Sequence, residues 1–264
     1  MSDRDMYRKL PKTGGDPRSV AEIVNNLVEG KSNNTGNITL ATGNATTTTI
    51  NDERIGYNSI ILLTPISSAA GNDAVPYGAF QDTTDQTIAS TTTAYAMTLN
   101  TTDYSNGVYL SNSSRMNVRN AGTYNLQWSG QFQNTDVIAH NANVWLRKNG
   151  TDVTGSAGLV AIPSSHGGID GHTIVSWNYF IELAANDYVE LYWQADNTDV
   201  SLQHYAAGTS PTRPSTASLI TTMNYVSPSA STNVYVSART KGSATLKHFA
   251  NNTADKTYGY IIVG

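Results

Sequence analysis

The sequence predicts an all-β protein, and three observations lead to this prediction. The polar residues Thr, Asn and Ser number 34, 26 and 25 of 264, whereas only 14% of residues are charged. Short segments alternate apolar with polar residues, and turns rich in Gly, Asn and Asp separate them. Only one segment has the spacing of an amphipathic helix. These features are typical of a chain with many strands and turns rather than of a helical enzyme.

The composition also restricts the classes of partner and chemistry. The chain has 16 Lys and Arg against 20 Asp and Glu, a formal net charge of −4, and no Cys. The lack of Cys excludes disulfides, a thiol nucleophile and thiolate metal sites. Because the few cations are not clustered, no nucleic acid is expected as a partner. No apolar run reaches the roughly 18 residues that span a bilayer, so no membrane insertion is expected.

The single predicted helix lies near the start of the chain. Asp16 precedes Pro17, a pair that caps and begins a helix, and Gly30 is suited to end it. The apolar face, spaced by three and four residues, consists of Val20, Ile23, Val24, Leu27 and Val28. A helix of about 13 residues is marginal alone, so this face is expected to dock, either on its own domain or on another subunit. We interpret residues 1–35 as an arm whose helix face serves attachment.

Both flanks of the remaining chain carry predicted strands. Those on the N-terminal side are residues 37–41, 46–50 and 59–64. Those on the C-terminal side are a hairpin at 233–249, turning at Lys241-Gly242, and a last strand at 258–264. Neither flank has enough strands to cover a core of its own. We therefore expect residues 36–68 and 229–264 to form one small split β domain, into which residues 69–228 are inserted.

The inserted segment has the clearest strand pattern. Its alternating apolar positions are Tyr124, Leu126, Trp128, Val144, Leu146, Tyr179, Ile181, Leu183, Val189, Leu191 and Trp193. Asn149-Gly150 predicts a tight hairpin between two strands. Evenly spaced short strands with polar turns predict a β-sandwich or jelly roll. Because Trp145 and Phe180 lie on the opposite faces of their strands, we hypothesise that they belong to a subunit interface.

Four segments of the insertion carry distinctive motifs in a fixed order. They are GTYNL at 122–126, NVWLRKNGTDV at 143–153, YFIELAANDYVEL at 179–191 and PSTASLIT at 214–221. These segments resemble C1q/TNF-like jelly-roll domains, particularly those of bacteriophage virion proteins. The sequence departs from the family at Asn186-Asp187, where Gly-Asp is usual in a turn that needs positive φ. The resemblance implies a jelly roll that assembles as a homotrimer around a threefold axis.

The flanking halves carry a second set of motifs. These are LPKTGGDPRSVAEIVNNL at 10–27, NNTG at 33–36, IILLTP at 60–65, YVSAR at 235–239 and YGYIIVG at 258–264. They are similar to a short protein of marine and cyanobacterial podoviruses. This similarity implies a structural protein of the virion, and it implies no catalytic residue.

The chemistry-bearing residues do not form a recognisable catalytic or metal motif. The five histidines are His140, His166, His172, His204 and His248, and none has the spacing of a zinc site. His166 and His172 flank a Gly-rich loop, where a solvated loop is favoured over a metal site. Asp196 to Asp199 offers oxygen ligands for calcium but lacks an EF-hand loop. We therefore predict no catalytic residue, no cofactor and no metal, and we expect that the chain is not an enzyme.

Two functions remain compatible with the sequence. The first is a structural protein on the phage surface, as a head decoration or fibre or as part of a tail fibre or spike. Its partners would be two further copies of itself and other virion proteins, with assembly in the host cytoplasm. The second is host recognition, in which the tip loops 154–173 and 204–217 bind a host glycan or protein. His166 and His172 are the candidate residues of the first of these loops.

Overall fold

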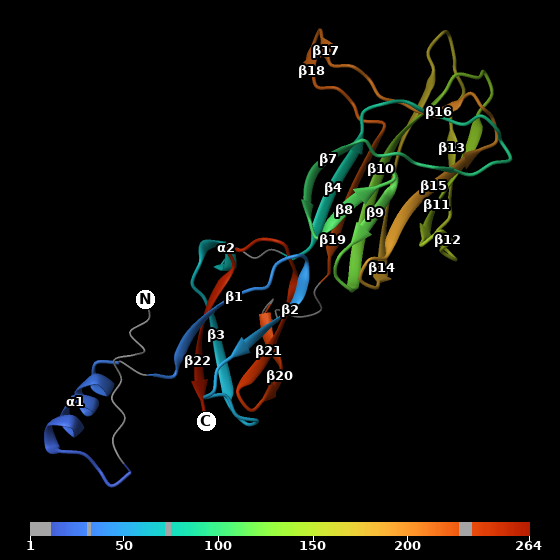
Figure 1. Cartoon of the computed structure of the whole chain (residues 1–264). Coiled ribbons are helices and arrows are strands. Elements are labelled where there is room, and N and C mark those ends of the chain that lie inside the picture. Colours follow the sequence, from blue (N-terminus) through green and yellow to red (C-terminus); the bar gives the residue numbers. More distant parts are fainter. Residues whose placement is uncertain (1–11, 31–32, 72–74, 227–233) are drawn as a thin grey trace. The chain divides into compact units, whose positions relative to one another are not determined.

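The computed structural model describes residues 12–30, 33–71, 75–226 and 234–264, and most of these lie in β-strands. The all-β class predicted from the sequence is confirmed. The chain divides into two compact units, Met1–Asp73 with Thr232–Gly264 and Ala74–Ser231. In Figure 1 the smaller unit therefore contains both the blue and the red parts of the chain. The predicted junction at 228/229 and residues 1–11 of the predicted arm lie outside the described residues.

Helix α1 (Pro17–Val28) begins and ends as the sequence predicts. The Asp16 carboxylate accepts hydrogen bonds from the backbone N–H groups of Arg18, at 3.0 Å, and Ser19, at 3.1 Å. These two bonds satisfy donors that have no partner within the first turn. At the other end Gly30 adopts φ +78°, the left-handed conformation that ends many helices.

The smaller unit consists of two three-stranded antiparallel sheets, β1-β22-β3 and β2-β21-β20. Their strands are β1 (Thr35–Thr39), β2 (Ala45–Asn51), β3 (Ile60–Pro65), β20 (Val234–Thr240), β21 (Ser243–Asn251) and β22 (Thr257–Val263). The C-terminal strand β22 lies between β1 and β3, so neither flank of the chain forms this sheet alone. The predicted hairpin is confirmed, with Gly242 at φ +86° between β20 and β21.

The short helix α2 (Ser68–Gly71) belongs to the smaller unit. The Tyr258 hydroxyl donates to the Ala70 carbonyl at 3.4 Å, and the Thr257 N–H donates to Ser67 Oγ at 3.0 Å. These contacts hold the chain against β22 beyond the end of β3. The structural division consequently falls after residue 73, whereas the sequence pattern placed it after residue 68.

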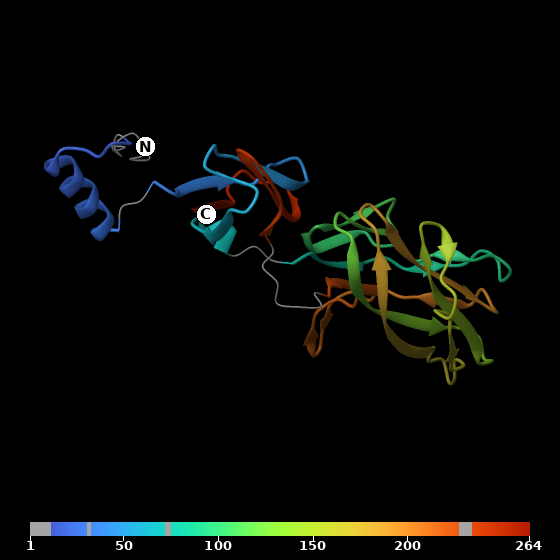
Figure 2. The same ribbon diagram turned by 90° about the horizontal axis from the view of Figure 1, so that it is seen from below.

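The larger unit is a sandwich of two seven-stranded antiparallel sheets (Figures 1 and 2). The first, here the β14 sheet, has the order β5-β16-β10-β19-β4-β7, and β14 pairs with β10. Its strands are β4 (Tyr77–Asp82), β5 (Gln86–Thr87), β7 (Thr101–Asn106), β10 (Gly122–Asn134), β14 (Gly171–Leu183), β16 (Val200–Leu202) and β19 (Leu219–Tyr225). Strand β14 pairs with β10 along its whole length and with no other described strand, so β14 is an edge strand.

The second sheet, here the β15 sheet, has the order β12-β11-β15-β9-β8, with β13 on β11 and β6 on β15. Its strands are β6 (Tyr95–Ala96), β8 (Val108–Ser111), β9 (Arg115–Val118), β11 (His140–Lys148), β12 (Thr151–Asp152), β13 (Gly158–Ile162) and β15 (Tyr188–Ala195). A small hairpin of β17 (Gly208–Thr209) and β18 (Thr212–Arg213) extends from the β16–β19 connection.

The alternating apolar positions face the core between the two sheets. Tyr124, Leu126 and Trp128 of β10 are buried there, as are Val144, Leu146, Val189, Leu191 and Trp193 of the other sheet. On the edge strand β14, by contrast, Leu183 is buried while Tyr179 and Ile181 are only half-buried. The alternation therefore predicted the faces correctly, and the position of a strand within its sheet set the depth of burial.

Two turns of the sandwich depend on residues in the left-handed conformation. Asn149 and Gly150 have φ of 49° and 81°, and they join β11 to β12 in the predicted tight hairpin. Asn186 has φ of 70° in the turn between β14 and β15. Asn tolerates this conformation better than other residues with a Cβ, so the departure from Gly leaves the turn intact.

Candidate functional site

One end of the sandwich gathers most of the histidines and several carboxylates. We call it the loop end: it comprises segments 83–85, 135–139, 163–170, 196–199 and 203–217. The strand register brings these segments together, because Asn134 of β10 lies opposite both Gly171 of β14 and Val200 of β16. The residues of interest there are Asp85, Asp136, His140, His166, Asp170, His172, Asp196, Asp199, His204 and Tyr205.

The two loops predicted as tip loops meet at His172 and Tyr205. The Tyr205 hydroxyl lies 3.2 Å from His172 Nδ1, and the two rings pack edge to face with centroids 5.9 Å apart. Paired backbone hydrogen bonds between Tyr205 and Thr216 hold the second loop in place. Both rings therefore present a fixed aromatic surface at the start of β14.

Carboxylates flank this aromatic pair. Asp85 accepts a hydrogen bond from the backbone N–H of His204 at 2.8 Å, and Asp170 accepts one from the Gln133 amide. Partial burial raises the pKa of the Tyr205 hydroxyl, and the charges of Asp170 and Asp85 raise it further. The phenol consequently stays protonated near neutral pH. A phenol, an imidazole and carboxylates together offer donors, acceptors and an apolar ring face to a hydroxyl-rich ligand.

His166 lies apart from this pair, in a tight turn. Its backbone N–H donates to the Ile169 carbonyl at 2.9 Å, and Gly167 and Gly168 both have positive φ. Its side chain is exposed, as is that of Ile169. Among the described residues, no group of three or more His, Cys, Asp or Glu side chains is arranged to hold a metal ion.

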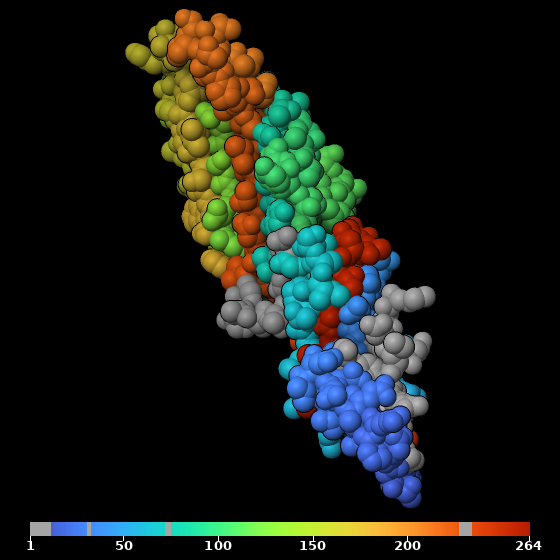
Figure 3. All heavy atoms as spheres, turned by 90° about the vertical axis from the view of Figure 1, so that its left-hand side faces the viewer, coloured from blue at the N-terminus to red at the C-terminus, as the bar shows by residue number. Residues whose placement is uncertain are grey.

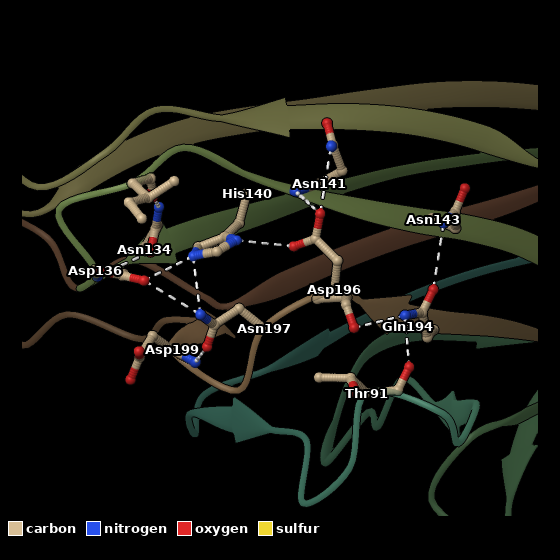
Figure 4. A network of polar contacts seen from close by, with 12 residues as sticks. Thr91, Asn134, Asp136, His140, Asn141, Asn143, Gln194, Asp196, Asn197 and Asp199 are labelled. Carbon is tan, nitrogen blue, oxygen red and sulfur yellow. Dashed lines mark hydrogen bonds and ion pairs between the residues drawn. The ribbon is translucent and has the colours of Figure 1, made fainter.

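A second polar cluster at the loop end centres on His140 (Figure 4). Asp136 lies 2.9 Å from His140 Nε2, and Asp196 lies 3.0 Å from Nδ1. The hydrogen bond with Asp136 and the charge of Asp196 raise the pKa of His140, because both stabilise the doubly protonated ring. The same bond lowers the pKa of Asp136. Asn197 also donates to Asp136, at 3.2 Å.

The oxygen atoms of the segment from Asp196 to Asp199, the candidate calcium ligands, take part in the contacts of the His140 cluster. Asp196 accepts the backbone N–H of Asn141 at 3.0 Å besides contacting His140, and Asn197 Oδ1 accepts the N–H of Asp199. The sequence alone did not predict this cluster. The one local sign of it in the sequence is the spacing of four residues between Asp136 and His140. That spacing gives no information about Asp196, which lies 56 residues after His140.

The structure separates Trp145 from Phe180. Trp145 is on the outer face of the β15 sheet, where its Nε1 donates to Asp152 at 2.7 Å. Its neighbour Tyr192 lies beneath the Arg147 guanidinium, 3.9 Å from the ring centroid. Phe180 is on the outer face of the β14 sheet and is 64% exposed. The two aromatics thus do not form one surface, because their strands belong to different sheets.

Four adjacent strands of the β14 sheet have an outer face that is almost free of charge, and Asp103 of the neighbouring β7 contacts Gln81 at its border. Among the outward positions of the described strands β14, β10, β19 and β4, Glu182 is the only Asp, Glu, Lys or Arg. Figure 3 shows these strands as adjacent bands, from olive (β14) to teal (β4). Exposed Ile174, Phe180 and Ile220 project from this face. Between them lies a shallow hollow lined by Gln127, Ser129, Ser176, Asn178, Ile220 and Thr222.

The predicted attachment face of α1 is uncovered. Val20, Val24, Leu27 and Val28 are exposed, and Ile23 is intermediate. The expected docking of this face on its own domain is therefore not seen in the described residues. None of the described helices has the length and apolar character to cross a membrane.

Comparison of the chain with protein-family models and with curated proteins gives no match.

Proposed function

We propose that the chain is a non-enzymatic structural protein of a bacteriophage particle, and that its sandwich, a C1q/TNF-like jelly roll, assembles as a homotrimer on the virion surface. The arm and the smaller unit attach it to other virion proteins. The observation that carries the self-association is the scarcity of charge on the outer face of strands β14, β10, β19 and β4, where Glu182 is the one charged residue among the described outward positions. The phage context rests on the sequence resemblance.

The composition of this face supports contact between copies. The buried centres of protein interfaces are depleted of charged residues, as these four strands are. Phe180, Ile174 and Ile220 supply apolar area, and the amides and hydroxyls between them can pair with the same groups of another copy. The outer face of the β15 sheet differs, because the ion pair of Arg147 and Asp152 lies on it.

Light scattering of the purified full chain tests this proposal. One chain has a mass of 28.3 kDa, so a trimer has three times that mass. Phe180→Asp replaces the most exposed aromatic residue of the proposed interface by a charge and is expected to lower the molar mass. The control Val137→Asp changes an exposed aliphatic residue at the loop end and should leave the mass unchanged. A wild-type mass of one chain contradicts the trimer, and purified phage particles without this protein contradict the virion role.

The contact between His172 and Tyr205 favours a second function, host recognition at the loop end. A fixed aromatic pair flanked by Asp85 and Asp170 is suited to bind the hydroxyl groups and apolar ring face of a glycan. Binding to a glycan array or to host cells should fall after Tyr205→Ala. Tyr57→Ala, an exposed tyrosine of the smaller unit, is the matched control. Equal binding by both variants contradicts recognition at this pair.

A further inference from the structure

The smaller unit exposes an apolar sheet face. On the outer side of β1-β22-β3, Ile261 lies opposite Leu62, and Val263 lies opposite Ile60. These four side chains are between 40% and 57% exposed. The other outward positions of the sheet hold Thr, Asn and Gly259, so this face bears no charge. We call it the β22 face.

The helix α1 exposes a second apolar surface in the same chain. Its stripe of Val20, Ile23, Val24, Leu27 and Val28 contains no charged residue. The four aliphatic side chains other than Ile23 are between 38% and 82% exposed. A helix of 12 residues has little stability alone and requires packing of its apolar face. The stripe therefore needs a covering surface.

The two surfaces match in size. Twelve helical residues are about 18 Å long, and the six residues of β3 extend about 20 Å. Three strands span two interstrand spacings, about 10 Å, which is close to the diameter of a helix with its side chains. One helix laid along this sheet would cover the β22 face and bury its own stripe, which is the usual way in which a helix and a sheet form two layers.

We infer that the α1 stripe of one copy packs on the β22 face of a second copy. Each chain supplies one stripe and one face, and both are open in the described chain, so exchange between copies covers both in equal number. A foreign partner would have to cover two separate apolar surfaces. In a closed ring of copies, each helix passes to the next copy and no surface is left over. The inference rests on the proposed self-association and adds a second contact to it.

The absence of Cys allows a direct test by paired cysteines in the full chain. Val24→Cys with Leu62→Cys places one thiol on the stripe and one on the β22 face. Both positions are exposed, so the reduced variant should keep the wild-type melting temperature. Mild oxidation is expected to yield chains linked to each other on a non-reducing gel. Glu22→Cys with Leu62→Cys is the matched control, because Glu22 lies on the opposite side of the helix, and it should link far less.

Two results overturn the inference. One is a monomeric band whose thiols no longer react with iodoacetamide, which means that α1 packs on its own sheet. The other is the absence of a specific interchain link: the thiols of Val24→Cys with Leu62→Cys stay reactive after oxidation, or this variant forms no more linked chains than the Glu22→Cys control. The Phe180→Asp mass measurement separates this inference from the proposed function. If the molar mass falls with Phe180→Asp but the cysteine pair forms no interchain link, only the further inference is contradicted. If the cysteine pair links chains but Phe180→Asp leaves the molar mass at its wild-type value, only the proposed sandwich interface is contradicted.

Discussion

Replacing Leu246 by Ala tests whether the two units unfold separately. Leu246 is fully buried on β21 in the core of the smaller unit. Among the described residues this core has ten buried apolar side chains, whereas that of the sandwich has 24. Truncation of a buried Leu to Ala leaves a cavity and costs roughly 2.7–5 kcal/mol. For a unit of this size each kcal/mol lowers the melting temperature by roughly 4–8 °C. A loss of about 3 kcal/mol therefore lowers the melting temperature of the smaller unit by roughly 12–24 °C.

The distribution of tryptophan provides the assay. All four tryptophans, Trp128, Trp145, Trp177 and Trp193, lie in the sandwich. Tryptophan fluorescence thus reports only the sandwich, whereas calorimetry reports both units. Where the chain enters and leaves the sandwich, Tyr77 of β4 pairs with Asn224 of β19, so the sandwich remains closed when the smaller unit unfolds.

We expect Leu246→Ala to move the lower calorimetric transition while the fluorescence midpoint stays at its wild-type temperature. The matched control is Leu126→Ala, in the core of the sandwich, which should lower the fluorescence midpoint. If the fluorescence midpoint falls with Leu246→Ala as far as with Leu126→Ala, the two units unfold as one and the reasoning is refuted.

Three further predictions concern single polar contacts. Tyr124→Phe removes a buried hydroxyl that donates to the Asn120 carbonyl at 2.8 Å. It should lower the free energy of unfolding of the sandwich by about 1–2 kcal/mol, and an unchanged denaturant midpoint would contradict this prediction. His140→Gln should cost most stability below about pH 6.5, because the folded-state pKa of His140 is raised. That stability is lost as pH rises through the folded pKa. The carboxylates stay ionised from about pH 5 to pH 9, so a difference in unfolding free energy between wild type and variant that is constant over this range argues against the network. Asp16→Ala should weaken α1 by about 1 kcal/mol and reduce helical circular dichroism, whereas Asp16→Asn should preserve most of the signal.

Local patterns of the sequence predicted helix α1 and the longer strands, but not the short helix α2 or strands such as β4 and β9. The cap at Asp16, the period of two along β10 and the Asn149-Gly150 turn each depend on neighbouring residues, and each prediction is confirmed. The alternation did not predict how deeply each apolar side chain is buried. Ile181 has the same alternation as Leu126, yet it is only half-buried, because β14 has a neighbour on one side alone.

The sequence by itself determined the all-β class, the helix α1 with its apolar stripe, and the turns that need positive φ, since each follows from side-chain periodicity or backbone sterics over a few residues. The tertiary structure alone decided which distant residues meet. His172 contacts Tyr205, and His140 lies between Asp136 and Asp196, because long-range strand register brings separate loops to one end of the sandwich. The same register placed Trp145 and Phe180 on different sheets. It also left the outer face of β14, β10, β19 and β4 with Glu182 as the one charged residue among the described outward positions, a property of four strands together that no single segment reveals.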